Sequence, residues 1–415
     1  MKARHILSGL FVFSILLAAC ATATPAPTAA PGEPTSAPAG GPPGVCATDA
    51  GGCAVIESGQ TIKIGMGAPM TGDNAAFGKD ISQGAMIAID DGGEFNGFKF
   101  DLIAEDDQGA PEGGAAVANK LVSDPTVVAI AGHIFSGATL AAIPIYEKAG
   151  LPMMSPSATN PDLTKAGSPV FNRLVFTDAD QGRFAAGYIY NKMGARKIVA
   201  MHDGQAYGQG LAQVVADEFK KLGGEVLAFQ AITPGESDYV AVLTSLAALS
   251  PDVLYFGGYT AEGVVIVNQM KAAGMATTKF FGCDGTFGQD FLDRTGVIGE
   301  GAYSTALIPA ASDAKSKFDA AYEARWGVVA GKLSPYSWTA YDSAAVLVKV
   351  IKDVGILGAD GKLYIPRSAL ITAVRGVKGY QGLSGTVTCS AVGECAGSGP
   401  TFYIIQGGKW VEAPK

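Results

Sequence analysis

From residue 61 onward, short apolar runs alternate with segments that have helical periodicity. The apolar runs lie at residues 62–66, 98–102, 127–131, 198–201, 253–256 and 279–281. Such alternation is typical of parallel β-sheets that are covered by helices on both faces. Because these units are too many for one sheet of ordinary size, we predict an α/β fold with two doubly wound lobes.

The rhythm changes in the last quarter of the chain. Helices are predicted at residues 313–327, 340–354 and 366–374, with a further strand at 401–405. These segments must return to one lobe or the other, so we expect the chain to cross between the lobes more than once. The expected ranges are 61–177 plus 306–385 for the N-terminal lobe and 178–305 plus 386–410 for the C-terminal lobe.

The first residues have the pattern of a secretory leader. A short basic region is followed by the apolar run 6–17, which is shorter than the roughly 20 residues that span a bilayer. We therefore predict a signal peptide at residues 1–19. The end of this run, Leu17–Cys20, resembles the bacterial lipobox, in which the cysteine is lipidated after cleavage. The alternative is a plain signal peptide in which Cys20 is incidental.

Residues 20–45 are rich in proline, alanine and glycine. Such a segment cannot bury enough apolar surface to order itself, so we predict a disordered linker that tethers the folded body to lipidated Cys20. No later run approaches the length of a membrane span. The chain is therefore expected to be secreted across the cytoplasmic membrane and lipid-anchored on its outer side, in the periplasm or at the cell surface.

Composition excludes several kinds of function. The chain has 30 basic and 38 acidic side chains and a net charge of −8, which argues against a nucleic-acid partner. Its 3 histidines leave little for a histidine metal site. No nucleophile elbow or phosphate-binding loop occurs, and Met70 stands where the third glycine of a dinucleotide-binding loop would be. We expect no metal, no cofactor and no enzyme activity.

The cysteines suggest an oxidising compartment. Cys46 and Cys53 flank a glycine-rich turn, and Cys389 and Cys395 flank another short segment, so two short-loop disulfides are predicted. A four-cysteine zinc site is the alternative, although neither pair has C-x-x-C spacing. Cys283 is then a free thiol, which we interpret as a small buried apolar residue.

Polar loops follow several predicted strands, where ligands bind in open α/β sheets. Ser136 lies near the start of a predicted helix, where free N–H groups favour a carboxylate. Thr159 follows the next short strand. Helix capping alone is the alternative for both residues. His133 and His202 also follow strands and are interpreted as structural residues.

The loop Ser155–Thr164 closely resembles the signature of periplasmic branched-chain amino-acid-binding proteins, the type I receptors of ABC importers. Further segments resemble this family in the same order: Met70–Gly78, Val117–Leu121, His202–Gly210, Gly257–Tyr259 and Gly282–Gly285. The resemblance extends over residues 61–406. The paired cysteines near both ends resemble a lipid-anchored subgroup. The resemblance implies two lobes joined by a multi-crossover hinge, which close on an amino acid.

The resemblance also implies roles for individual residues. Ser136 and Thr159 would bind the ligand's α-carboxylate, and the backbone carbonyl of Ser157 would accept from its α-ammonium. Asp284 stands where the family usually has a glutamate that binds this ammonium. The other expected site residues are Ala158 in the same loop, Phe77 and Phe135 along the side-chain pocket, and Tyr207 and Tyr259 from the second lobe. Asp178 is interpreted as a hinge or helix-cap residue rather than a ligand contact.

These observations lead to one main hypothesis and two alternatives. The main hypothesis is a monomeric receptor that delivers an amino acid, or a similar small polar solute, to the permease subunits of an ABC importer. The first alternative keeps the fold but makes the chain a ligand-sensing module for a signalling partner. The second is a secreted enzyme that uses Asp284 and His202 in the cleft.

Overall fold

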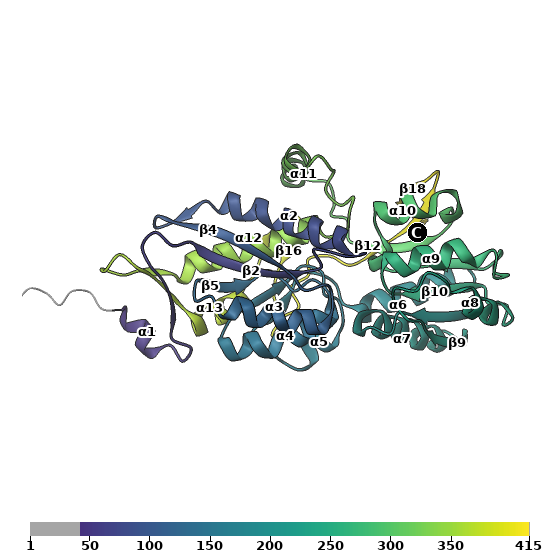
Figure 1. Cartoon of the computed structure of the whole chain (residues 1–415), viewed down its shortest axis with the longest axis horizontal. Helices are drawn as coiled ribbons and strands as arrows, with labels where there is room; N and C mark the ends of the chain where they lie inside the picture. Colours follow the sequence, from purple (N-terminus) through teal and green to yellow (C-terminus); the bar gives the residue numbers. More distant parts are fainter. Residues whose placement is uncertain (1–41, 415) are drawn as a thin grey trace, which may run out of the picture. The chain divides into compact units, whose positions relative to one another are not determined.

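A computed structural model describes residues 42–414. The predicted signal peptide, lipidated Cys20 and most of the predicted linker therefore lie outside the described residues. The linker was predicted to end at residue 45, but helix α1 (Gly44–Thr48) begins within that range. Two large sheets, each with helices on both faces, make up most of the described part (Figure 1). The predicted α/β class and doubly wound lobes are confirmed.

The first sheet is built mainly from parallel strands. From edge to edge its strands are β3 (Glu94–Phe95), β4 (Phe98–Asp106), β2 (Ile62–Ala68), β5 (Val127–Ile130), β6 (Met153–Ser155) and β7 (Phe171–Arg173). Only the short edge strand β3 pairs antiparallel. Strand β5 is buried at every position, as its continuous apolar run predicts.

Helices cover both faces of this sheet. One face carries α2 (Ala75–Gly92) and α12 (Ser337–Val354), and the other carries α3 (Pro111–Val122) and α4 (Ser136–Ala149). Residues of β5 pack to both sides: Val128 lies in the core with α2 and α12, whereas Val127 and Ile130 lie in the core with α3 and α4. Smaller elements of this lobe are β1 (Cys53–Ile56), α5 (Asp162–Lys165), α11 (Asp313–Trp326), β13 (Ile356–Leu357), β14 (Leu363–Pro366), α13 (Arg367–Arg375), β15 (Tyr380–Gln381) and β16 (Thr386–Val387).

The second sheet has a parallel centre and an antiparallel edge. Its strands, in spatial order, are β18 (Lys409–Glu412), β17 (Thr401–Gln406), β12 (Tyr303–Ala306), β11 (Lys279–Phe281), β10 (Val253–Gly257), β8 (Lys197–His202) and β9 (Glu225–Ala231). One side of this sheet carries α6 (Asp178–Asn191) and α7 (Ala206–Lys221). The other side carries α8 (Val240–Ala247), α9 (Thr260–Met270) and α10 (Gln289–Thr295). Two short 3₁₀ helices, η1 (Asp284–Thr286) and η2 (Gly296–Gly299), belong to the same lobe.

The chain passes between the two sheets at residues 174–177, 307–312 and 396–400. This agrees with the expected repeated crossing. One boundary differs from the expected ranges, which begin the last segment of the C-terminal lobe at residue 386. Strand β16 instead pairs with β15, and Glu394 forms a parallel bridge with Arg173 at the end of β7. Residues 386–395 thus lie on the first lobe, because their backbone bonds extend its sheet edge.

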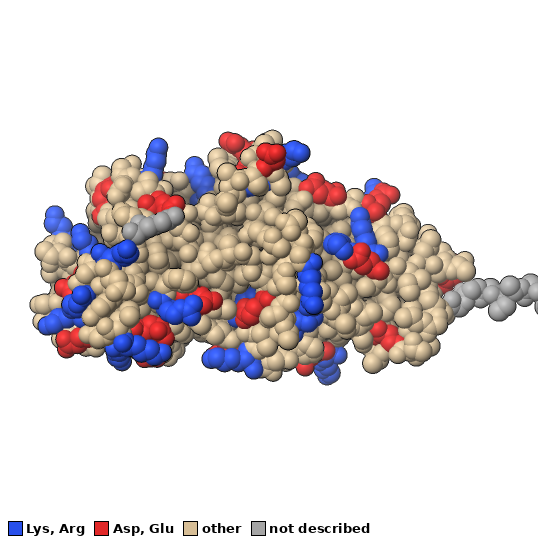
Figure 2. Space-filling model, turned by 180° about the vertical axis from the view of Figure 1, so that it is seen from behind, with Lys and Arg blue, Asp and Glu red and all other residues tan. Residues whose placement is uncertain are grey.

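The paired cysteines form the predicted disulfides, Cys46–Cys53 and Cys389–Cys395. The alternative zinc site is thereby excluded, because all four sulfur atoms are used in these bonds. Cys283 is a free, buried cysteine, as expected. Among residues 42–414, no helix is long and apolar enough to cross a bilayer. On the face shown in Figure 2, basic and acidic side chains are interspersed rather than gathered into a basic surface.

A buried carboxylate fastens α11 and α12 to α2. Asp80 of α2 is completely buried and accepts hydrogen bonds from the hydroxyl groups of Tyr322 (2.8 Å), Ser334 (2.6 Å) and Ser337 (2.7 Å). Burial raises the pKa of Asp80 to about 6, although the three hydroxyl groups lower it. The carboxylate is therefore hydrogen-bonded but lacks a cationic partner among these contacts.

We expect Asp80→Asn to change the pH dependence of stability. Unfolding returns the pKa of Asp80 from about 6 to 3.8, so between these values the folded protein binds more protons than the unfolded chain. The wild-type free energy of unfolding therefore falls as pH rises through this window, by about 3 kcal/mol from this group. Urea unfolding between about pH 4 and pH 7 should show the variant gaining this amount relative to wild type. If the difference in the free energy of unfolding between variant and wild type stayed constant with pH, the raised pKa of Asp80 would be wrong. The control is Asp101→Asn, on the exposed face of β4, which should show no such pH-dependent gain.

Candidate functional site

A small cavity lies between loops that follow the carboxyl ends of strands in both sheets. Its lining residues are Phe77, Ile134, Phe135, Ser136 and Ser157 from the first lobe, Tyr207, Tyr259, Asp284 and Gly285 from the second, and Tyr336 just before α12. The space between them is about 10 Å³, which is enough for about one water molecule. A solute as large as an amino acid could enter only if the lining side chains moved apart.

Aromatic rings from the two lobes contact each other across this cavity. Phe135, before α4, stacks on Tyr259, before α9, with ring centroids 4.1 Å apart and an interplanar angle of 10°. Phe77 meets both rings edge-on, and Tyr207 lies 5.1 Å from Tyr259. The rings form an apolar wall, and separating the lobes would break the stacked pair.

Asp284 supplies the negative charge of the cavity. Its carboxylate accepts hydrogen bonds from the hydroxyl of Tyr207 (2.6 Å), the amide of Gln181 (2.6 Å) and the hydroxyl of Tyr336. Burial raises the pKa of Asp284, and these three donors lower it. No lysine or arginine is among the described residues that line the cavity. A cationic group entering beside Asp284 would therefore meet an uncompensated carboxylate.

A second buried carboxylate lies behind Asp284. Asp178, in the first turn of α6, accepts from the Gln181 amide at 3.0 Å, so the same amide group bridges both aspartates. Burial and the neighbouring charge of Asp284 raise the pKa of Asp178 well above its ordinary value. The helix cap itself is Thr177, whose hydroxyl accepts from the Asp180 N–H at 3.2 Å. Asp178 does not line the cavity, and its role as a hinge or helix-cap residue stays a prediction.

The first lobe presents the start of α4 and the loop after β6. Ser136 makes no side-chain cap of α4; its hydroxyl accepts from the Asn160 N–H at 3.3 Å. The hydroxyl of Ser157 donates to the Ile134 carbonyl at 2.7 Å. The first N–H groups of any helix lack partners within that helix, so the start of α4 offers donors to an anion.

The structure places seven of the nine predicted site residues around the cavity. The other two, Ala158 and Thr159, do not line it. The carbonyl of Ala158 accepts from Arg173 at 3.1 Å, and that of Thr159 accepts from the Asp178 N–H at 3.0 Å. The Thr159 hydroxyl is buried without a hydrogen-bond partner among the described residues. Their role as ligand contacts stays a prediction.

Sequence reasoning missed Tyr336 and Gln181. Gln181 stands in the predicted hinge segment, but no local pattern indicates that its amide reaches Asp284, which is 103 positions away. Tyr336 precedes α12 in a region without strands, so the rule about strand ends could not find it. A buried tyrosine and glutamine next to a carboxylate are recognised only once the lobes are assembled.

His133 and His202 do not line the cavity. His133 is fully buried, with Nδ1 2.7 Å from Asp107 Oδ2 and Nε2 2.9 Å from the Tyr146 hydroxyl. His202 packs on Phe229 with ring centroids 4.6 Å apart. Their contacts fit the structural interpretation, and His202 is not among the described residues that line the cavity with Asp284.

Sequence comparison identifies the family to which this two-lobed arrangement belongs. Residues 61–398 match the sequence profile of periplasmic binding proteins. The chain belongs to the periplasmic binding protein family. The resemblance noted from the loop Ser155–Thr164 is thereby confirmed, and the family consists of solute-binding receptors rather than enzymes.

Curated members of this family include proteins that are similar over most of the chain. A Pseudomonas aeruginosa protein named amino acid binding protein is 33% identical over 295 residues, covering 69% of this chain and 76% of its own length. A Brucella melitensis protein named Leu/Ile/Val-binding protein homolog 3 is 32% identical over 352 residues, covering 84% and 91%. The Escherichia coli Leu/Ile/Val-binding protein is 36% identical over 249 residues, covering 59% and 67%.

Solved structures of family members share the fold. A leucine-binding protein of Thermotoga maritima superposes with a TM-score of 0.77 at 26% identity, covering 85% of this chain and 98% of its own. A branched-chain amino-acid transporter substrate-binding protein of Streptococcus pneumoniae, solved with isoleucine, superposes with a TM-score of 0.74 at 27% identity and the same coverage. The type I periplasmic binding protein fold is thus shown for this chain.

We expect Cys283 to be unreactive in the folded protein. The thiol is buried and donates to the Gly258 carbonyl at 3.2 Å, and burial together with the charge of Asp284 raises its pKa. In a chain with Cys20 replaced by serine, Ellman's reagent should find no thiol before unfolding and one thiol afterwards without reductant. Rapid labelling of the folded protein would show that the thiol is accessible.

Proposed function

We propose that this protein is an extracytoplasmic receptor that captures an amino acid with an apolar side chain between its two lobes. The observation that carries the proposal is the pairing of an unneutralised carboxylate, Asp284, with the start of α4 across one aromatic-walled cavity. A zwitterion needs one anionic partner, one set of N–H donors and little other charge. The names of the relatives, which include amino acid and Leu/Ile/Val-binding proteins, support the same ligand class.

Each end of the proposed ligand has a partner of suitable chemistry. The α-ammonium would lie against Asp284, whose three donors hold its carboxylate in place. The α-carboxylate would lie at the start of α4, near the Ser136 and Thr159 hydroxyls. The buried Thr159 hydroxyl makes no hydrogen bond of ordinary geometry among the described residues, although it lies close enough to the Asp178 carboxylate to lower the pKa of that group.

The side chain would be recognised by apolar contact. Phe77 and Phe135 lie on one side and Tyr259 on the other, with a stacking distance of 4.1 Å that a ligand must widen. Such walls discriminate by shape and hydration rather than by charge, as is usual in small-molecule sites. Branched aliphatic side chains suit this wall because they bury apolar surface without polar groups.

Binding between lobes makes ligand capture a conformational event. Residues from both lobes contact the same cavity, so a ligand held there favours the closed arrangement by its differential affinity for that arrangement. We propose that the permease subunits of an ABC importer recognise this closed arrangement and receive the ligand. We further propose that the receptor acts as a monomer, tethered through Cys20 outside the cytoplasmic membrane.

Calorimetric titration tests the ligand class and the role of Asp284. Wild-type protein, freed of bound solute by denaturation and refolding, should bind at least one branched-chain amino acid in a panel. Asp284→Asn should weaken that affinity at least about 30-fold, since removing a buried charge partner costs about 2 kcal/mol or more. Asp203→Asn changes a buried carboxylate of the same lobe that does not line the cavity, and should bind like wild type.

The ligand offers a second control. The analogue 4-methylpentanoate lacks the ammonium of leucine, so Asp284→Asn should not weaken its binding and should strengthen it, because the repulsion between two carboxylates is lost. If no amino acid in the panel bound the wild-type protein, the proposed ligand class would be wrong. Mass spectrometry of the solute that copurifies with the protein would then identify the ligand directly.

Detergent partitioning tests the proposed anchor. The full-length protein expressed in a bacterial host should enter the detergent phase of Triton X-114, because lipid chains on Cys20 add buried CH₂ groups. Cys20→Ser should move it to the aqueous phase. Cys283→Ser is the control, because it also removes a single cysteine, and should stay in the detergent phase. If the wild-type protein stayed in the aqueous phase, the proposed lipid anchor on Cys20 would be wrong.

A further inference from the structure

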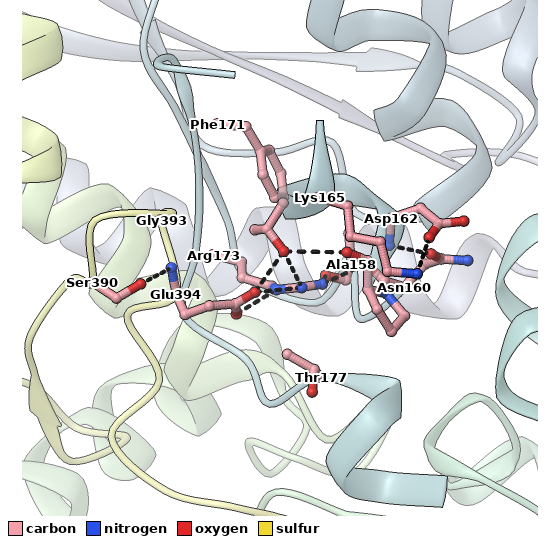
Figure 3. Close-up of polar contacts among 12 residues, drawn as sticks. Ala158, Asn160, Asp162, Lys165, Phe171, Arg173, Thr177, Ser390, Gly393 and Glu394 are labelled. Atoms are coloured by element: carbon pink, nitrogen blue, oxygen red, sulfur yellow. Dashed lines mark hydrogen bonds and ion pairs between the residues drawn. The ribbon is translucent and has the colours of Figure 1, made fainter. Parts of the chain in front are cut away.

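Arg173, at the end of β7, is the largest completely buried side chain in the described part of the chain. A buried guanidinium is costly unless it is paired and its N–H groups are all hydrogen-bonded. Arg173 meets both requirements. The side chain lies between the binding loop after β6 and the disulfide-closed loop near the C-terminus (Figure 3).

All five N–H donors of Arg173 have partners. On one side, Nε donates to Glu394 Oε2 at 2.8 Å and Nη2 donates to Oε1 at 2.7 Å. Nη2 also donates to the Thr164 hydroxyl at 3.2 Å. On the other side, Nη1 donates to the carbonyls of Ala158 (3.1 Å) and Asn160 (2.8 Å). The side chain therefore joins a carboxylate to two carbonyl groups of the binding loop.

The carboxylate of Glu394 is itself held in place by the disulfide loop. The Glu394 N–H donates to the Ser390 hydroxyl at 3.1 Å, and its backbone carbonyl accepts from the Ser390 N–H at 2.8 Å. The Cys389–Cys395 bond closes this short loop. Two backbone hydrogen bonds, each 2.9 Å long, attach the residues on either side of Glu394 to the sheet edge. The Arg173 N–H donates to the Gly393 carbonyl, and the Cys395 N–H donates to the Arg173 carbonyl.

The binding-loop carbonyls belong to residues that border the site. The Asn160 N–H donates to the hydroxyl of Ser136, which lines the cavity. The Asn160 side-chain amide donates to the Ala206 carbonyl at the start of α7, at 2.6 Å, which is a contact between the two lobes. The orientation of the 158–160 backbone therefore sets both a cavity wall and a lobe-closing bond.

We propose that Glu394 and Arg173 are positioning residues for ligand binding: the Cys389–Cys395 loop fixes the carboxylate, the carboxylate fixes the guanidinium, and the guanidinium orients the backbone of residues 158–160. Neither side chain touches the cavity. The inference rests on the proposed function only in that the loop is expected to contact the ligand; the backbone ordering itself is independent of what the ligand is.

Amide hydrogen exchange and ligand affinity, measured on the same purified proteins, test this inference. In E394Q the charge is lost and one acceptor becomes a donor that faces the guanidinium. We expect exchange at residues 158–160 to become at least tenfold faster, with amides of β2 keeping their wild-type rates. Affinity for the best amino-acid ligand should fall at least tenfold. C389S/C395S should act in the same direction, and E394D, which keeps the charge, should restore part of both losses.

Two variants of the same lobe serve as matched controls. E57Q removes the surface ion pair Glu57–Lys362 (2.9 Å), and C46S/C53S removes the other disulfide. Both should leave loop exchange and affinity within twofold of wild type. If E394Q fails to fold, T164V removes a neutral hydroxyl that donates to the same carboxylate and accepts from Arg173, and it should speed loop exchange at least threefold.

The outcomes separate the inference from the proposed function. If the amides of residues 158–160 exchanged at the wild-type rate in folded E394Q, the positioning role would be wrong, even if the wild-type protein binds leucine tightly. The same holds for T164V if E394Q does not fold. Faster exchange with no amino acid bound by the wild type would overturn the proposed ligand class and support the positioning role. Equal effects in C46S/C53S and C389S/C395S would show general destabilisation and would also overturn it.

Discussion

Parallel strand pairing is the constraint on which the rest of this structure depends. Parallel neighbours need a crossover between them, and here each crossover contains a helix that covers one face of a sheet. All carboxyl ends of the parallel strands then lie at one edge of each sheet. Loops that are far apart along the chain, such as those with Ser157 and Asp284, consequently meet at one cavity.

Charge is distributed unevenly around that cavity. Arg173, the buried cation of the first lobe, has a carboxylate partner and five satisfied N–H donors. The buried aspartates, Asp178 and Asp284, share an amide, and Asp284 also accepts from two tyrosine hydroxyls, but no lysine or arginine lines the cavity within the described residues. Neutral donors offset only part of the cost of burying a carboxylate. The site is therefore electrostatically prepared for a small cation such as an ammonium group.

The two disulfides have different surroundings. Cys46–Cys53 closes a loop beside β1, which pairs with β14 at the border of the first lobe. Cys389–Cys395 holds a carboxylate against a buried arginine and lies on the route by which the chain returns to the second sheet. Short loops of this kind stabilise modestly through chain entropy. The second disulfide therefore contributes more through what it positions than through the size of the loop it closes.

The sequence by itself determined the class of fold, the order of its strands and helices, the disulfide pairing and most of the cavity lining. The fold class, the order of elements and the disulfides follow from local signals: apolar runs, helical periodicity and cysteine spacing. Most of the cavity lining was instead implied by the resemblance to the periplasmic binding protein family, and polar loops after strands indicated only Ser136 among the lining residues. Only the tertiary structure decided that Tyr336 and Gln181 hold Asp284, that residues 386–395 lie on the first lobe, and that Ala158 faces Arg173. These contacts join residues with no shared local pattern, such as Arg173 and Glu394, which are 221 positions apart. The packing of the assembled protein sets these contacts, and no periodicity along the chain encodes that packing.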